Sequence, residues 1–261
     1  MNHVVTSTAF SPDDPAVVDH FHEHGWVLTD DLDADEVVEL QRWVDEVAAT
    51  FGDSASILHH REMTDFGPKL ARSENFVPVH EGLRNLLTRR LVTTASRLLG
   101  ETAVLYKEKV NYKLIGGAGF SPHQDAPAYP FIDSHVSCMV AVDDATPENG
   151  CLEVVSGRHQ HLLDMDERGC IVASIVEDMV WHFAPIRAGQ TLWFHSLTPH
   201  RSGANRSTRD RRALYPTYNA LSEGDLREAY YAEKLERFAA AERGERVVLS
   251  LIGDFEGRPV D

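Results

Sequence analysis

The spacing of apolar residues is helical in the first part of the chain. In residues 33–51, apolar side chains recur every three or four positions, as on one face of an amphipathic helix. Asp33 and Glu36 stand where a capping box would begin that helix. Residues 82–100 show the same spacing and stop at a glycine, which is a common signal for a helix end. The first hundred residues are therefore predicted to be mainly helical.

From residue 102 onward, short β-like runs alternate with clusters of Gly, Pro, Asn and Asp. Such runs predict an antiparallel sandwich or barrel. The runs are 103–114, 134–142, 151–157, 191–196 and 212–220, and helical spacing returns at 225–241. We expect one domain, 1–261, that is mainly β with flanking helices. Its helical N-terminal part spans about 12–100, its barrel core about 102–220 and its C-terminal helix about 225–241.

Charge and composition exclude several classes of partner. The net charge is 25 − 41 = −16, which argues against nucleic acid and anionic membranes as partners. No apolar run approaches membrane-spanning length, and the N-terminus lacks the pattern of a secretory signal. Cys138, Cys151 and Cys170 form no CxxC pair, so reduced thiols and a cytoplasmic location are expected. The sequence gives no indication of the oligomeric state.

Residues 105–114, LYKEKVNYKL, alternate between an aromatic-rich face and a basic face. The basic face carries Leu105, Lys107, Lys109, Asn111 and Lys113. One interpretation is an edge strand whose lysines point into water and discourage aggregation. The other places the basic row inside a barrel mouth, where it would select an anionic ligand. The individual roles of Lys107 and Lys113 stay open.

The segment HQDAPAY contains two residues that can bind a metal. His123 and Asp125 are two positions apart, so a strand would place both on one face. An isolated H-x-D is weak evidence, but His200 and Arg211 follow a later apolar run. Two histidines and one carboxylate on one face of iron leave three positions open. An arginine can clamp a carboxylate through its planar fork.

Together these motifs resemble the phytanoyl-CoA dioxygenase family of Fe(II)/2-oxoglutarate oxygenases. The resemblance covers most of the chain and includes FHEHGWVLTDDLDADEVVELQ, HQD, ENGCLEVVSGRHQ and PHRSGANRSTRDRRAL. It implies a double-stranded β-helix (jelly-roll or cupin-like) barrel. It also implies Fe(II) as cofactor, with 2-oxoglutarate and O2 as co-substrates.

Carried over residue by residue, the resemblance makes His123, Asp125 and His200 the iron ligands and catalytic residues. It makes Arg211 the anchor of 2-oxoglutarate and Ser202 its hydroxyl helper. His195 is a rival for the distal ligand, but its spacing to the other motif residues fits the family less well, so we interpret it as structural.

The reaction implied is hydroxylation of an unactivated C–H bond, coupled to conversion of 2-oxoglutarate into succinate and CO2. Asp125 favours hydroxylation, because related halogenases have a small residue at this position. Desaturation and ring chemistry stay open.

The basic strand also resembles the family branch that hydroxylates small aminoalkylphosphonates. In that branch a Lys and an Asn two residues apart help to hold the phosphonate, and Lys109 and Asn111 match them. Gln124 is expected to add a substrate contact. Tyr129 either packs against a substrate ammonium group or fills space in its loop. The substrate is thus expected to be a small anionic or zwitterionic metabolite, at best an (amino)alkylphosphonate.

Other substrates fit the same motifs. They include an ectoine-like zwitterion, a natural-product intermediate and an acyl-CoA, although no separate basic patch for a nucleotide is evident. A non-catalytic barrel that binds a small anion is the alternative of a different class, and the intact ligand set disfavours it.

Overall fold

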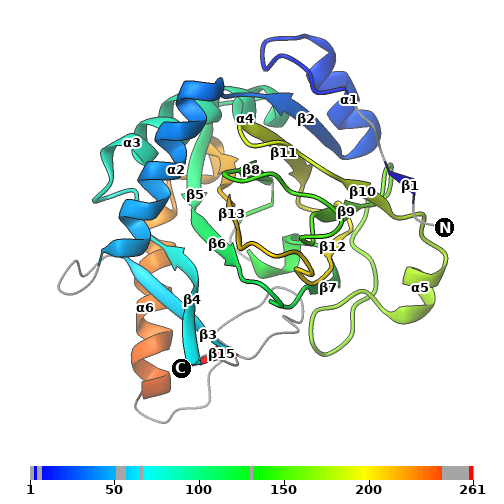
Figure 1. Ribbon diagram of the computed structural model, residues 1–261. Helices are drawn as coiled ribbons and strands as arrows, with labels where there is room; N and C mark the ends of the chain where they lie inside the picture. The colour runs from blue at the N-terminus through cyan, green and yellow to red at the C-terminus, as the bar shows by residue number, and fades with distance from the viewer. Residues whose placement is uncertain are drawn as a thin grey trace.

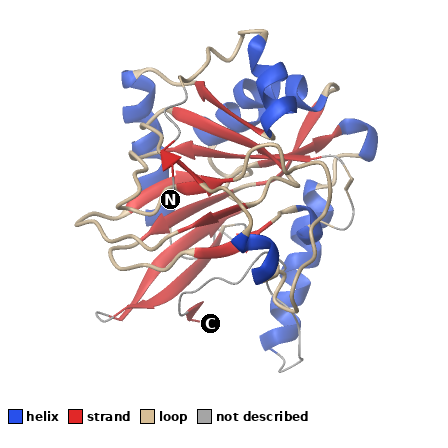
Figure 2. Ribbon diagram, turned by 90° about the vertical axis from the view of Figure 1, so that its right-hand side faces the viewer, coloured by secondary structure: helices blue, strands red, loops and turns tan. Residues whose placement is uncertain are grey.

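Two β-sheets form the centre of the molecule, and helices lie outside them (Figures 1 and 2). The computed structural model describes residues 3–4, 8–50, 57–64, 67–129, 132–133, 135–242 and 259–260. Helices α2 and α6 flank the larger sheet beside β4, β5 and β6, whereas α5 lies by the smaller sheet on the other side (Figure 1). The predicted class, mainly β with flanking helices, is confirmed.

The larger sheet contains ten strands among the described residues. Its main path runs β15-β3-β4-β6-β13-β8-β11-β2, and β14 pairs with both β8 and β5. The strands are β2 (Trp26–Asp30), β3 (Leu58–Thr64), β4 (Gly67–Glu74), β5 (Ala103–Lys107), β6 (Lys109–Lys113), β8 (His135–Ala141), β11 (Gln190–His195), β13 (Arg211–Leu214), β14 (Thr217–Ala220) and β15 (Pro259–Val260).

The smaller sheet has the order β1-β10-β9-β12-β7. Its strands are β1 (His3–Val4), β7 (Phe120–His123), β9 (Leu152–Val154), β10 (His182–Ala184) and β12 (His200–Ser202). Apolar side chains from both sheets, including Met139, Leu152 and Phe194, fill the space between them. Short helices occur in the connections: η2 (Ala126–Ala128), α5 (Ala173–Glu177) and η3 (Leu221–Glu223).

The C-terminal helix α6 (Arg227–Glu242) packs through Tyr230 against Tyr106 and Tyr129. The remaining helices cover the outer face of the larger sheet: α1 (Ala16–His24), α2 (Ala34–Ala49), α3 (Glu81–Asn85), the π-helical turn η1 (Leu86–Arg90) and α4 (Leu91–Leu99). The predicted capping box begins α2: Asp33 accepts from the Glu36 amide, and Glu36 accepts from the Asp33 amide, both at 2.9 Å. Buried residues of these helices form one core with the outward residues of β8, such as Val136 and Val140.

The prediction of a mainly helical N-terminal third is wrong in one respect. This part also contributes β2, β3 and β4 to the larger sheet. β2 is a short continuous apolar run, and β3 and β4 are too polar to show a buried alternating pattern. The predicted strand 103–114 is divided at Glu108, and 212–220 is divided at Tyr215 and Pro216. Phe51 and Ser134, the ends of two predicted elements, lie outside the described residues.

The three cysteines are free thiols, and all are buried. No helix among the described residues is long and apolar enough to span a membrane.

Candidate metal centre and anion pocket

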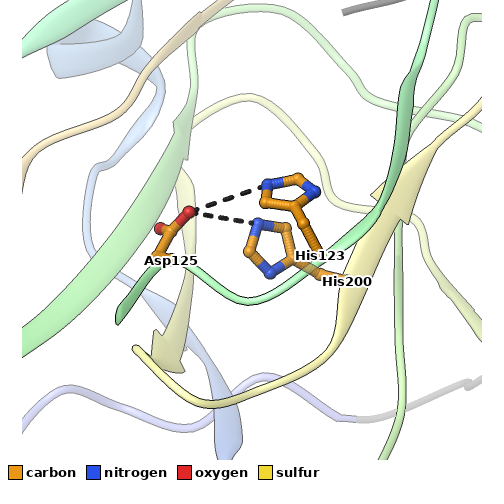
Figure 3. A group of neighbouring side chains, drawn as sticks. All are labelled: His123, Asp125 and His200. Carbon is orange, nitrogen blue, oxygen red and sulfur yellow. Dashed lines mark ion pairs between the residues drawn. The ribbon is translucent and has the colours of Figure 1, made fainter. Parts of the chain in front are cut away.

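Pairing within the smaller sheet brings the two predicted histidine ligands together. His200 on β12 lies opposite His123 on β7, and Asp125 follows two residues after the end of β7. One ligand atom from each of the three side chains falls within 4.8 Å of the others. Each Nε2 lies 3.7 Å from Asp125 Oδ1, as Figure 3 shows. These three buried side chains could hold one metal ion.

Each of these side chains is held by a further hydrogen bond. His123 Nδ1 lies 2.7 Å from the Ser121 carbonyl oxygen, and His200 Nδ1 lies 3.0 Å from that of Thr198. A carbonyl only accepts, so both Nδ1 atoms carry the hydrogen and both Nε2 lone pairs face the carboxylate. The Ser137 hydroxyl donates to Asp125 Oδ2 at 3.0 Å. Such outer partners fix the orientation of metal ligands.

Electrostatics favour a neutral His123 and an ionised Asp125, as metal binding requires. Burial, reinforced by the nearby His200, lowers the pKa of His123 to about 3. Burial opposes the charge on Asp125, but the pull of His200, His123 and two lysines outweighs it and lowers the pKa of this carboxyl. Neutral imidazoles and an ionised carboxylate suit a divalent transition metal such as Fe(II).

His195 lies outside this group. Its Nδ1 accepts a hydrogen bond from the Leu197 amide at 3.0 Å, and its ring packs 5.5 Å from that of His159. The geometry therefore selects His200 over His195 as the third member of the group.

Arg211 lies at the start of β13, opposite Lys113 on β6, on the face of the larger sheet that also carries Ala213 in the core between the sheets. It is 3% exposed; one Nη donates to the Gly150 carbonyl at 3.3 Å, and its Nε has no partner among the described residues. Arg212 points the other way and pairs with Asp143 at 2.7 Å on the outside of the sheet. These adjacent arginines thus point to opposite faces of β13, as alternation along a strand predicts.

Lys113 and Ser202 lie beside Arg211. The Lys113 ammonium group donates to Ser202 Oγ and to the Gly150 carbonyl, both at 3.1 Å, and also to the Gly203 carbonyl. The sequence left the role of Lys113 open. The structure places it with two of the residues expected to bind 2-oxoglutarate.

The basic strand is not at an edge, so its interpretation as a surface strand is wrong. β6 pairs with β4 on one side and β13 on the other. In this register Lys109 lies opposite Glu74, and Asn111 lies opposite both Arg72 and Ala213. Cross-strand partners share a face, so these side chains lie on the same face as Arg211.

Lys107 lies deeper than the sequence indicated. Its side chain is 5% exposed and lies opposite Thr217 on β14, although the alternation of residues in the sequence also allowed it to point into water. It also acts more strongly than Lys109 on the charge of Asp125. Burial lowers the pKa of Lys107 to about 8, although Asp125 and Glu74 oppose that shift. Burial, then Arg72 and Lys107, lower the pKa of Lys109 well below its usual range.

Two other predicted substrate contacts already have partners in the chain. The Gln124 amide nitrogen donates to the carbonyls of His161 at 3.0 Å and Leu197 at 2.5 Å, and its oxygen accepts from the Leu163 amide at 2.8 Å. Both amide hydrogens of Gln124 are donated to backbone carbonyls, so this side chain links two loops beside the metal ligands. Its contact with a substrate stays a prediction, limited to the carbonyl oxygen.

Tyr129 is 2% exposed, and the Lys107 ammonium group lies 4.4 Å from the centre of its ring. The cation that packs on the Tyr129 ring is thus Lys107 of this chain. A contact between Tyr129 and a substrate ammonium group stays a prediction.

Sequence reasoning missed several residues around this pocket. Arg72 and Glu74 come from β4, in the part expected to be helical, and Lys234 comes from α6. Arg72 and Glu74 have one local signal in the sequence: they are two residues apart, which on a strand places both on one face. Ser137 was hidden inside the apolar run of β8, where strand alternation would have placed it on the same face as His135 and Met139.

The profile of the phytanoyl-CoA dioxygenase (PhyH) family matches residues 21–213. The chain is 44% identical over 247 residues to the methylphosphonate hydroxylase of Gimesia maris, covering 93% of this chain and 95% of that protein. It is 40% identical over 180 residues to the 2-aminoethylphosphonate dioxygenase of the uncultured bacterium HF130_AEPn_1, covering 67% of this chain and 69% of that protein.

Solved structures share the fold. EctD from S. alaskensis, crystallised with 2-oxoglutarate and 5-hydroxyectoine, superposes with a TM-score of 0.70 at 21% identity, covering 85% of this chain and 84% of that one. The epimerase SnoN, crystallised with Fe3+ and alpha ketoglutarate, gives 0.67 at 24% identity, covering 79% and 85%. The double-stranded β-helix fold is thereby confirmed. By the length of the profile match and the identity to its relatives, this chain belongs to the phytanoyl-CoA dioxygenase family.

Proposed function

We propose that this chain is an Fe(II)- and 2-oxoglutarate-dependent dioxygenase that hydroxylates a small alkylphosphonate. The observation that carries the proposal is a buried excess of positive charge beside the histidine–aspartate group. Lys107 and Lys109 both act on Asp125, and Asn111 Oδ1 has no partner among the described residues. A phosphonate dianion would neutralise this excess, and two relatives are named for phosphonate substrates.

The donor set fits iron, since it consists of two buried imidazoles and one buried carboxylate whose ligand atoms lie within 4.8 Å of one another. When bound, the iron, with 2-oxoglutarate and O2, supplies the oxidising power for an unactivated C–H bond. His123, Asp125 and His200 would hold the metal, and Ser121, Thr198 and Ser137 would orient them.

Arg211 would bind the distal carboxylate of 2-oxoglutarate, because its Nε donor is buried and free among the described residues. Lys113 and Ser202 would support that carboxylate from the neighbouring strands. Lys109 and Asn111 would hold the phosphonate so that its adjacent carbon lies toward the metal. The depth of the pocket would exclude water from the reacting atoms.

Succinate release tests this function. The protein is loaded anaerobically with Fe(II) and 2-oxoglutarate, then exposed to O2 with methylphosphonate, 2-aminoethylphosphonate, ectoine or an acyl-CoA. We expect a phosphonate to stimulate succinate release most strongly and to appear as its hydroxylated product. His123→Ala serves as the inactive control. Stimulation by ectoine or acyl-CoA alone would refute the substrate class, and no stimulation with no Fe(II) binding would refute the oxygenase.

A further inference from the structure

One wall of the pocket is built by a cross-chain ion pair between α6 and β4. The Lys234 ammonium group contacts the Glu74 carboxylate. Glu74 is 2% exposed and lies opposite Lys109 in the strand register, so its side chain faces the proposed phosphonate site. Lys107 interacts electrostatically with Glu74 and Lys234 as well as with Asp125. Lys107 therefore connects this wall to the metal site.

Glu74 already has several partners within the chain. Besides Lys234, Arg72 Nη1 lies 3.4 Å and His60 Nε2 lies 3.3 Å from its Oε1. Burial opposes its charge, but Lys234, His60 and Arg72 hold the pKa of the Glu74 carboxyl well below its usual range. This carboxylate is thus ionised, and it already pairs with side chains of the chain itself.

The balance of charge around the two pocket lysines is positive. The charged groups that act on Lys107 and Lys109 include the cations Arg72 and Lys234, but only two carboxylates, Glu74 and Asp125. Asp125 belongs to the metal group. Even without Lys109, whose pKa is lowered, the cations Lys107, Arg72 and Lys234 share the single remaining carboxylate among these residues. An anionic group therefore fits the site better than an ammonium group.

The described residues around Lys107 and Lys109 offer no unpaired carboxylate to a substrate ammonium group. The sequence suggested the Tyr129 ring as a cation–π partner for such a group. The Lys107 ammonium group already lies 4.4 Å from the centre of this ring. Glu74 is occupied by Lys234. A positive group entering the pocket would meet like charges and would lose its hydration without compensation.

We propose that the Lys234–Glu74 ion pair sets the specificity of this site for alkylphosphonates that carry no ammonium group. The inference rests on the proposed function and refines it. Lys234 occupies the one carboxylate that an aminoalkylphosphonate would need, and it adds a positive charge that repels such a substrate.

A size-matched pair of compounds tests the proposal. Propylphosphonate and 2-aminoethylphosphonate have the same number of heavy atoms, and they differ by a methyl in place of an ammonium group. We expect kcat/KM for propylphosphonate to exceed that for 2-aminoethylphosphonate by about tenfold or more, because the free energy of one charge-assisted contact corresponds to a ratio of this size. A compound that binds without turnover is compared by its inhibition constant against methylphosphonate.

Lys234→Met should remove the closest cationic partner of Glu74, leaving Arg72 and His60, and should shift this ratio toward 2-aminoethylphosphonate by about tenfold. Lys234→Arg, which keeps the cation, should keep the original ratio. Arg237→Met removes a cation that pairs with Glu233 on the same helix, and it controls for net charge. Adding Glu74→Gln to Lys234→Met should abolish the shift. If Lys234→Met does not fold, Lys234→Gln, which retains a donor to Glu74, provides the same test.

The outcomes separate the two proposals. A wild-type preference for 2-aminoethylphosphonate overturns the specificity role while leaving the phosphonate hydroxylase intact. An unchanged ratio of kcat/KM for the two compounds in folded Lys234→Met also overturns the specificity role. Absence of turnover and of inhibition by every phosphonate overturns the function itself.

Discussion

Lys107→Met should stabilise the metal-free protein and weaken its binding of an anionic substrate. Methionine matches the length of the lysine stem and can pack on Tyr129, whose ring lies 4.4 Å from the ammonium group. The substitution therefore removes a buried charge without leaving a large cavity.

The size of the effect follows from the pKa of Lys107, which is lowered from 10.5 to about 8, mainly by burial. This difference corresponds to about 3 kcal/mol of destabilisation of the charged form. Because the pKa is lower in the folded protein than in the unfolded chain, the cost is fully present below pH 8. It disappears as the pH rises to 10.5. For a chain of this size, Lys107→Met should raise Tm by about 5 °C or more at pH 7.

The effect on binding has the opposite sign. A charge-assisted hydrogen bond contributes about 1.5–3 kcal/mol, so loss of Lys107 should raise KM for a phosphonate roughly ten- to a hundredfold. The sequence left the role of Lys107 open. The burial of Lys107 and its action on Asp125, which is stronger than that of Lys109, make an effect of this size the expectation.

Thermal unfolding of the metal-free wild type and variant at pH 7 and pH 10 measures the first effect, and steady-state kinetics measure the second. The gain in Tm should shrink at pH 10. Lys69→Met, on an exposed part of β4, is the control. A variant that is less stable at pH 7, or one that binds phosphonates normally, would refute the reasoning.

Three further predictions concern the metal and co-substrate ends of the pocket. His200→Ala should abolish Fe(II)-dependent turnover of 2-oxoglutarate whereas His195→Ala retains it, and the reverse pattern in a succinate assay would contradict the ligand assignment. Arg211→Ala should raise KM for 2-oxoglutarate about tenfold or more, and Arg212→Ala, which removes the outer ion pairs with Asp45 and Asp143, should not. Ser137→Ala should weaken Fe(II) affinity about 10- to 100-fold in an anaerobic titration, because it removes the partner of Asp125; unchanged affinity would show that this hydrogen bond does not position the carboxylate.

The motif residues could be predicted from sequence because their signals are local. HQD is contiguous, and the capping box at Asp33 and Glu36 spans four residues. The opposite directions of Arg211 and Arg212 followed from strand alternation alone. Arg72 and Lys234 could not be predicted in the same way. They reach the pocket through pairing of β4 with β6 and packing of α6, contacts that join residues more than thirty positions apart and leave no pattern in either segment.

The two sheets divide the chemistry of the pocket between them. The smaller sheet carries the candidate metal ligands, since His123 ends β7 and His200 begins β12. The larger sheet carries the cations that face these ligands. Ser137, also on the larger sheet, donates a hydrogen bond directly to Asp125 of the metal group. Substitutions on β4 or β6 can therefore change the charge offered to a substrate while leaving the metal geometry in place. That separation is the physical reason for expecting Lys109 and Lys234 variants to alter which phosphonate is used, and His200 variants to remove activity with all of them.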